Sequence, residues 1–370
     1  MAYNWQQKDW PEFRYTLNDI EDALFAFAEE TGHLSGILKG MPEKVQTETM
    51  IDIMVSEAIK TSEIEGEYLS RPDVISSIRN NLGLNINQEK IKDKKAEGAG
   101  KLMVVVRNTF SSPLTERDLF SWHRMLMNQN PQIKVGVWRT HKEPMQVVSG
   151  AMGKEKIHFE APPSSSVPGE MRKFINWFND TAPGGKKEIK KSPVRSAIAH
   201  LYFETIHPFE DGNGRIGRAI AEKALSQTTG RPVFLSLSQT IGGNRKSYYA
   251  ALEKAQNSNE ITAWINYFVN TLLEAQRQTK IFIDLTLRKT KFFDRFKNQL
   301  NERQLKAVKR MIDAEPKGFE GGMTAKKYSS LAKVSKATAT RDLQELTDLK
   351  ILLIRRGGRS TNYSINLSAS

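Results

Sequence analysis

The chain has 370 residues, of which 39% are hydrophobic, so it is long enough for two or three globular domains, each with its own core. It contains no cysteine, which excludes disulfide bonds and thiolate metal sites and fits a reducing compartment. The first residues, MAYNWQQKDW, lack the basic segment and apolar run of a secretory signal, and no stretch approaches the roughly 20 apolar residues of a membrane span. We therefore expect a cytoplasmic protein that does not bind a membrane.

The net charge of +13 is distributed unevenly along the chain. Residues 280–370 contain 20 Lys or Arg and 9 Asp or Glu, so most of the excess positive charge lies in the last quarter. Such a segment is typical of contact with a polyanion, nucleic acid being the commonest. The alternative is a solvated basic face, and the charge alone leaves both interpretations open.

Helical periodicity dominates the first third of the sequence. Apolar residues recur at helical spacing in residues 17–38 and 48–69, and again in residues 99–130. A polar, lysine-rich connection, NINQEKIKDKKAEG at residues 85–98, separates the second and third of these segments. We expect helices on both sides of this connection.

The pattern changes between residues 136 and 171, which are rich in Gly, Pro, Ser and β-branched residues. The short apolar runs MQVV and KIHF in this stretch predict a β-hairpin. Helices are expected to resume at about Pro168 and to break at the loop TAPGGKKEIKKS. They continue through SPVRSAIAHLYFETI, then RAIAEKALSQTTG with a stop at Gly230, and two amphipathic segments that end near residue 278. A domain boundary is predicted in the charged helix at residues 279–299.

Residues 207–218 read HPFEDGNGRIGR and follow a predicted helix that ends at Ile206. The next helix is predicted to begin near Asn213 or Gly214, so the backbone N–H groups of residues 212–214 lie at a helix N-terminus. Unpaired N–H donors and the positive end of the helix dipole favour an anion there, and glycine lets a phosphate approach the backbone closely. The pattern is typical of a phosphate-binding loop.

The side chains of this segment add chemistry to the loop. Arg215 and Arg218 lie three residues apart on one helix and are placed to clamp a polyphosphate. Asp211 is placed to hold a hard cation such as Mg²⁺, and His207 to take a proton from an attacking hydroxyl. The alternative is a plain turn with a packed histidine and solvated charges. A turn does not require His, Asp, Asn and two spaced arginines together, so the ordered set favours a functional site.

Residues 207–218 resemble, at every fixed position, the HPFx[D/E]GNGRxxR signature of Fic-domain proteins. The best-known activity of that family is the transfer of AMP from ATP to a protein hydroxyl. The resemblance extends over roughly residues 95–275. It implies a mainly α fold with a helical Fic core, and it implies Mg²⁺ as cofactor with ATP as substrate.

The resemblance also implies roles for single residues. His207 corresponds to the general base and Asp211 to the Mg²⁺ ligand, while Arg215 and Arg218 correspond to the contacts with the β- and γ-phosphates. The backbone of the two glycines and the side chain of Asn213 correspond to a cradle for the α- and β-phosphates. The implied nucleotide-binding residues of the motif are Asp211, Gly212, Asn213, Gly214, Arg215, Ile216, Gly217 and Arg218.

Phe209 corresponds to a buried anchor of the loop. RKSYYAAL, at residues 245–252, resembles the nucleotide-base helix of the family, which implies that Tyr248, Tyr249 and Gln256 lie near the adenine. The alternative for the two tyrosines is an amphipathic helix that packs its aromatic rings. The sequence leaves this choice open.

The predicted hairpin at residues 145–159 resembles the flap of the family, on which an extended target segment adds as a strand. Main-chain hydrogen bonds then align the target hydroxyl with the α-phosphate, so the flap sequence says little about the target. The docking residues implied by this resemblance are Ile157, His158 and Phe159.

TSEIEG at residues 61–66 contains the pattern [S/T]xxxE[G/N], with Thr61, Glu65 and Gly66 at the fixed positions. Alone it is a weak pattern, and its alternative is a solvated helix end. Beside the Fic signature it resembles the inhibitory helix of the family, in the class where that helix precedes the catalytic core. A carboxylate paired with Arg218 would occupy the arginine that binds the γ-phosphate, and separating the pair would leave an uncompensated ion. In some relatives the same glutamate orients a water for removal of AMP.

Residues 301–365 predict two short helices around a turn at Val334 and Ser335, with Ser335 as the N-cap, followed by two strands joined by a Gly-Gly turn. This order resembles a winged helix-turn-helix, which is compatible with DNA or with protein contact only. The residues then expected to face DNA are Lys336, Thr338, Thr340 and Arg341 in a major groove and Arg355, Arg356 and Arg359 at phosphates.

The sequence therefore predicts an autoinhibited Fic adenylyltransferase that transfers AMP to a Ser, Thr or Tyr hydroxyl of a target protein, or of the chain itself. Alternatives are a de-adenylylase that uses the same site and a nucleotide-sensing, DNA-binding regulator. A homodimer is left open. The predicted domains are a helical regulatory domain at residues 1–94, the Fic domain at 95–278, a helical connection at 279–300 and the winged helix at 301–370.

Overall fold

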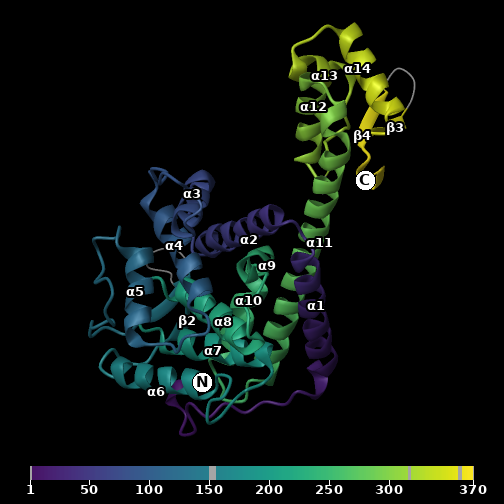
Figure 1. Cartoon of the computed structure of the whole chain (residues 1–370). Helices are drawn as coiled ribbons and strands as arrows, with labels where there is room; N and C mark the ends of the chain where they lie inside the picture. The colour runs from purple at the N-terminus through teal and green to yellow at the C-terminus, as the bar shows by residue number, and fades with distance from the viewer. Residues whose placement is uncertain (1, 150–155, 316–317, 357–360, 370) are drawn as a thin grey trace. The chain divides into compact units, whose positions relative to one another are not determined.

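The computed structural model describes residues 2–149, 156–315, 318–356 and 361–369 (Figure 1). Helices make up most of these residues, and the strands in this part of the chain form two separate two-stranded sheets. The mainly α fold expected from the sequence is therefore confirmed. No helix among the described residues combines the length and the apolar character needed to cross a membrane.

The chain divides into two compact units, residues 1–279 and 280–370. The long helix α11, Thr262–Phe296, contributes residues to both. Within the first unit, Met54 and Val55 belong to the same buried hydrophobic cluster as Leu102 and Phe203. The segment before residue 94 therefore shares a core with the segment that follows it, and the first 279 residues fold as one unit.

The first unit begins with a short 3₁₀ turn, Asn4–Gln6, and three helices, α1 at Glu21–Lys39, α2 at Glu43–Ile64 and α3 at Arg71–Asn81. Helix α2 stops at Glu65, and Gly66 follows with a φ of 80°, which L side chains rarely adopt. The predicted glutamate thus lies where α2 ends, followed by the glycine that lets the chain turn away.

The stretch at residues 99–130, which reads as one helical pattern, forms two helices, α4 at Lys94–Asn108 and α5 at Glu116–Met127. Pro113 disfavours helical backbone in the residue before it, and Thr115 begins α5 with a capping box that it forms with Asp118. Helix α4 also begins earlier than expected, inside the polar connection, because Asp93 accepts hydrogen bonds from two backbone N–H groups of its first turn.

The remaining helices of the first unit surround the motif at residues 207–218. They are α6 at Val167–Asp180, α7 at Ser192–Ile206, α8 at Asn213–Thr229, α9 at Leu237–Gly243 and α10 at Arg245–Ala255. Every residue of α7 is buried, and α8 packs closely along it. A Cβ atom at Gly217 would lie 2.1 Å from the Oε1 atom of Glu204, so a larger residue here would require the buried carboxyl of Glu204 to shift. The two helices that flank the motif therefore hold it at the centre of the unit.

The predicted hairpin is confirmed as strands β1, Gln146–Ser149, and β2, Lys156–Glu160, paired antiparallel with Val147 opposite Phe159. The register shifts between Val147 and Val148, which marks an irregularity in β1. The turn that joins the strands lies outside the described residues.

The second unit contains α12 at Glu302–Ile312, α13 at Ala325–Ala332, α14 at Lys336–Asp348, and strands β3, Leu352–Arg356, and β4, Asn362–Ile365. The predicted N-cap is confirmed, since the hydroxyl of Ser335 accepts a hydrogen bond from the backbone N–H of Thr338. The strands pair antiparallel as expected. The predicted Gly-Gly turn and Arg359 lie outside the described residues.

Two helical glycines provide a matched test of the packing of the first unit. A Cβ at Gly98 would lie 1.9 Å from the backbone oxygen of Met125, whereas nothing lies within 4 Å of one at Gly32. We expect Gly98→Ala to lower the free energy of unfolding by about 1–3 kcal/mol because of overpacking. Gly32→Ala should raise it by up to about 1 kcal/mol, since alanine favours a helix.

Urea unfolding followed by tryptophan fluorescence measures both effects, because all 6 tryptophans lie in residues 1–279. Equal stability of Gly98→Ala and the unchanged chain would contradict the close contact between α4 and α5.

Candidate functional site

The motif joins two helices through residues with left-handed backbone. His207 ends α7 with a φ of 49°, and Gly212 begins α8 with a φ of 81°. The first value is uncommon for a residue with a side chain, and such conformations persist where the surrounding structure imposes them. The loop between the two helices is thus a tight, fixed connection, and its exit presents the first N–H groups of α8.

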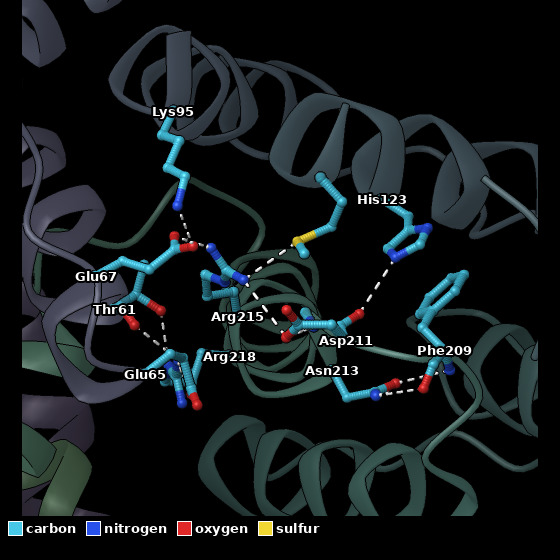
Figure 2. Close-up of polar contacts among 12 residues, drawn as sticks. Thr61, Glu65, Glu67, Lys95, His123, Phe209, Asp211, Asn213, Arg215 and Arg218 are labelled. Atoms are coloured by element: carbon cyan, nitrogen blue, oxygen red, sulfur yellow. Dashed lines mark hydrogen bonds and ion pairs between the residues drawn. The ribbon is translucent and has the colours of Figure 1, made fainter. Parts of the chain in front are cut away.

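Asn213 and Phe209 fix the loop from inside. The side chain of Asn213 accepts a hydrogen bond from the backbone N–H of Phe209 at 2.9 Å and donates one to its carbonyl at 2.8 Å (Figure 2). Phe209 is fully buried and stacks on the ring of His123, with ring centroids 4.1 Å apart. The anchor predicted at Phe209 is therefore present. The side chain of Asn213 holds the backbone of the loop through these two hydrogen bonds. Its contact with a phosphate, which the sequence analysis expects, stays a prediction.

Two residues that the sequence reasoning missed also hold the loop. The Nδ1 atom of His123 accepts a hydrogen bond from the N–H of Gly136, so its Nε2 carries the proton and donates to the carbonyl of Asp211 at 3.2 Å. Arg139 donates to the carbonyls of His207, Ile206 and Pro162 and to the hydroxyl of Ser164. Both side chains are buried. Neither stands out in the sequence, because each lies in an ordinary amphipathic or loop pattern.

A cavity of about 690 Å³ opens beside the motif. Twelve of the residues singled out from the sequence line it: Glu65, His158, Phe159, His207, Asp211, Gly212, Asn213, Gly214, Arg218, Tyr248, Tyr249 and Gln256. These residues come from α2, β2, the motif and α10. The fold thus brings four separated segments of the sequence to one cavity.

Other predicted residues lie away from the cavity. Ile216 is buried in the hydrophobic core, and Gly217 faces Glu204 of α7, because the face of α8 that carries them packs inward. Arg215 is 3% exposed and points toward α2 and α4 (Figure 2). Thr61 lies beneath Arg218, and the side chain of Ile157 is exposed on the flap.

His207 is set up as a neutral imidazole. Its burial and the nearby Arg139 lower the pKa of His207 to about 4, so the ring is uncharged at pH 7. Its Nδ1 atom lies 3.8 Å from a carboxylate oxygen of Glu204. Burial raises the pKa of Glu204 to about 8, against the opposing charge of Arg218, so that carboxyl is largely protonated at pH 7. A neutral histidine at the wall of a cavity is able to accept a proton.

Arg218 is held by the end of helix α2. Its guanidinium donates to the hydroxyl of Thr61 at 2.7 Å, to the carbonyl of Thr61 at 3.0 Å and to the carboxylate of Glu65 at 2.7 Å (Figure 2). The arginine is 1% exposed and the glutamate side chain 29%. Burial acts to raise the pKa of Glu65, but the attraction of Arg218 outweighs it and the pKa lies below its usual value. The pair is therefore ionised.

A second carboxylate holds the other arginine of the motif. Glu67 pairs with Arg215 through one oxygen and with Lys95 through the other, at 2.9 Å from the lysine Nζ (Figure 2). Arg245 of α10 also donates to the carbonyl of Ile64, where α2 ends. The sequence reasoning missed Glu67, although an acid two residues beyond Glu65 and just after a helix-ending glycine was a usable signal.

Among the acidic residues that line the cavity, Asp211 is the one that the sequence predicts to hold a metal ion. The side chain of Asp211 is half-exposed at the cavity, where its Oδ1 lies 3.7 Å from Arg215. Within the described residues, no group of three or more acidic or histidine side chains forms a closed metal cage. Mg²⁺ is commonly held by one or two carboxylates together with substrate phosphates, and the half-exposed carboxylate of Asp211 beside the N-terminus of α8 fits that arrangement.

The far side of the cavity is aromatic and polar. Tyr248 is buried and its hydroxyl lies 2.7 Å from the Nε2 of His200, whereas the ring of Tyr249 is 39% exposed. Tyr248 therefore packs as a core residue with one edge at the cavity, and Tyr249 presents its ring. His158 of the flap lies 3.0 Å from a carboxylate oxygen of Glu253, which joins the flap to α10.

In the second unit, the predicted DNA-facing residues lie on α14 and β3. Lys336, Arg341, Arg355 and Arg356 are exposed. The hydroxyl of Thr340 donates to the carbonyl of Lys336, and that of Thr338 lies 3.0 Å from the hydroxyl of Ser335. The four cations are therefore free to face solvent, while the two threonine hydroxyls are already engaged within the helix.

Two sequence families match parts of the chain. The Fic/DOC family matches residues 113–225, and a domain of unknown function, DUF4172, matches residues 3–84. The first match contains the motif and the second contains α1, α2 and the Glu65 segment.

Curated relatives carry the same region. A probable protein adenylyltransferase of Aquifex aeolicus is 35% identical over 98 residues, which cover 26% of this chain and 27% of the relative. Protein adenylyltransferases of Caenorhabditis elegans and Nematostella vectensis are 26% and 27% identical over 40% and 42% of this chain. The matched region spans only 25% and 32% of those two proteins.

Solved structures share the fold. A Fic family protein from Desulfovibrio desulfuricans has a TM-score of 0.54 and 19% identity, with 96% of this chain and 98% of that chain covered. A Fic-domain signaling protein from Bacteroides thetaiotaomicron has a TM-score of 0.52 and 20% identity, with 73% of this chain and 97% of that chain covered. At such identities the likeness concerns the fold alone, and the sequence match to the Fic/DOC family covers residues 113–225.

Proposed function

We propose that this protein is an adenylyltransferase that moves AMP from ATP to a hydroxyl group of a protein. One observation carries the proposal: a neutral His207, the first N–H groups of α8 and the guanidinium of Arg218 border one cavity large enough for a nucleotide. The names of the curated relatives that share this region support the same reaction class.

In the proposed reaction the target hydroxyl attacks the α-phosphorus of ATP. A new bond forms between the hydroxyl oxygen and this phosphorus, the bond to the oxygen that bridges the α- and β-phosphates breaks, and pyrophosphate leaves. His207 takes the hydroxyl proton. Because the imidazole is uncharged at pH 7, one of its ring nitrogens is available for this transfer.

The phosphates would lie against the N-terminus of α8. The N–H of Gly214 would donate to the phosphates, whereas that of Gly212 donates to the carboxylate of Asp211 in this structure, and Arg218 would fix the γ-phosphate. Asp211 would hold Mg²⁺, which neutralises the phosphate charge when bound. The aromatic face of Tyr249 offers the adenine a surface on which to stack.

We further propose that the end of α2 acts as a brake on this reaction. Glu65 and Glu67 each occupy one arginine of the motif, so the protein supplies the two negative charges that ATP would otherwise bring. ATP in the cavity would have to displace Glu65 from Arg218, and Arg215, which lies outside the cavity wall, would reach the phosphates only after it leaves Glu67. The brake would therefore have two parts, of which the sequence reasoning recognised one.

The first test of the reaction is His207→Ala. We expect transfer of labelled AMP from ATP to fall by about 10²- to 10⁴-fold, since general-base assistance is lost. ATP binding should change little, because the base acts on the incoming hydroxyl. Labelling of the chain itself or of proteins in a cell extract gives the first quantity, and calorimetry gives the second.

His33→Ala is the control, because His33 is an exposed histidine of α1. Wild-type labelling by the His207→Ala variant would show that another group is the base.

The second test concerns the brake and uses a set of variants. Glu65→Gly should raise labelling because Arg218 becomes available to orient ATP. Glu67→Gln should increase the affinity of the protein for ADP more than its affinity for AMP, because the freed Arg215 would reach the β-phosphate, which AMP lacks. The double variant Glu65→Gly with Arg218→Ala should not show the gain in labelling, because that gain requires the guanidinium of Arg218 to orient ATP.

Glu63→Gln is the matched control for both acids, because Glu63 lies in the same stretch but pairs with Lys60 at the surface. Release of AMP from pre-labelled protein is measured on the same variants. Loss of this release in Glu65→Gly, without a gain in labelling, would favour a role for Glu65 in AMP removal over a role as a brake.

A second candidate function, DNA binding, rests on the four exposed cations of α14 and β3 and on the net charge of the second unit. A helix-turn-helix followed by a two-stranded ribbon is an arrangement that places a helix in a major groove and the ribbon near phosphates. Binding through phosphates would then be a property of this unit and independent of nucleotide transfer.

The test is the salt dependence of binding to a mixed DNA pool. We expect the logarithm of the affinity to fall linearly with the logarithm of the salt concentration, with a slope of about −0.9 for each phosphate contact. Arg341→Ala and Arg355→Ala should each reduce this slope by about one contact and leave AMP transfer unchanged. No binding at low salt by the full chain would overturn the DNA proposal and favour protein contact.

A further inference from the structure

A short segment near the start of the chain lies against the candidate site. Residues 3–7, here called the strap, precede α1 and contact the flap, α7 and the end of α10. This segment belongs to the part of the chain that matches the domain of unknown function. None of its residues takes part in the proposed chemistry, so its contacts need another explanation.

Asn4 is the centre of the strap. It is completely buried, and its backbone N–H donates to the carbonyl of Gln256 at 2.8 Å. Its side-chain amide lies 3.3 Å from the hydroxyl of Thr205, two residues before His207. A buried polar side chain with such partners is specific in its placement, because unpaired polar groups are costly to bury. Asn4 thus connects the cavity residue Gln256 with the helix that ends at the proposed base.

The residues on either side of Asn4 hold the flap. The ring of Tyr3 packs edge-to-face on Phe159 at a centroid distance of 5.0 Å, and Phe159 is buried. The indole N–H of Trp5 donates to the carbonyl of Glu160, the last residue of β2, at 2.7 Å. Both contacts reach β2, the strand of the flap that leads back to the core.

The flap needs such support because an isolated two-stranded hairpin is marginally stable in water. Its own pairing is irregular between Val147 and Val148, and the contact of His158 with Glu253 is partly exposed to solvent. The strap contributes the buried side chain of Asn4 and the hydrogen bond from Trp5 to the carbonyl of Glu160. Dissolved salt screens neither contact strongly.

We propose that the strap is a positioning element of the active site. It fixes the position of strand β2 relative to His207. The inference rests on the proposed function, in which the flap presents the target hydroxyl. A target segment that adds to the flap follows the position of β2, and an error of about 1 Å in such a placement costs about 10²-fold in rate. Trp5 and Asn4 would therefore act on the transfer step without touching substrate.

The test is Trp5→Phe, which keeps an aromatic ring and removes the hydrogen bond to Glu160. Hydrogen exchange of the full-length chain, measured by mass spectrometry on the peptide that contains residues 156–160, reports on β2. We expect exchange to rise about fivefold, which corresponds to the loss of one hydrogen bond. Trp10→Phe is the matched control, because Trp10 donates its indole N–H to Glu170 of α6, away from the flap.

The functional experiment introduces Trp5→Phe and Trp10→Phe separately into the Glu65→Gly variant. It measures self-labelling with ATP as a function of protein concentration. Trp5→Phe should lower labelling at unchanged ATP affinity, and Trp10→Phe should not. Unchanged exchange at residues 156–160 overturns the proposal, as does faster exchange with unchanged labelling. Absence of labelling in every variant and in the unchanged chain would overturn the proposed function, and the positioning role with it, while the exchange result still decides whether the strap holds the flap.

Discussion

The burial of Arg218 is the constraint on which the rest of the first unit depends. A guanidinium that is almost completely removed from water needs a partner of opposite charge, because an uncompensated buried ion costs several kcal/mol. In this chain the partner comes from the end of α2, more than 150 residues earlier in the sequence. The N-terminal helices therefore pack with the motif in one compact unit, in which the end of α2 supplies the carboxylate that lies closest to Arg218.

The same constraint relates structure to chemistry. A site built for the phosphates of ATP must be positively charged, and a positively charged interior is costly until a ligand arrives. The carboxylates of Glu65 and Glu67 remove this cost in the absence of nucleotide, and they do so at the two arginines that the nucleotide would use. Under the proposed function, the stability of the protein without nucleotide and the restraint of its activity would both follow from the same two ion pairs.

The sequence predicted the parts of the site that are local. The motif, its two flanking helices, the hairpin and the N-cap at Ser335 follow from patterns within a few residues, and the signature residues at 61–66 pointed to Arg218. What it could not predict depends on distant partners. Arg139, His123 and the strap act through contacts with residues far along the chain, and their own sequence surroundings are ordinary. The contact of the Asn213 amide with the backbone of Phe209 was missed for the same reason, since only the folded loop reveals it.

The mixed chemistry of the contacts around Arg218 has an evolutionary consequence. Two of its three hydrogen bonds go to Thr61, one of them to a main-chain carbonyl that no substitution removes. If the proposed brake operates, a change at residue 65 would leave the two contacts with Thr61 in place, and a change at residue 67 would act on the neighbouring Arg215. Point substitutions at the end of α2 would adjust the basal rate of the protein in small steps, so lineages could set its threshold gradually while the reaction centre stays the same.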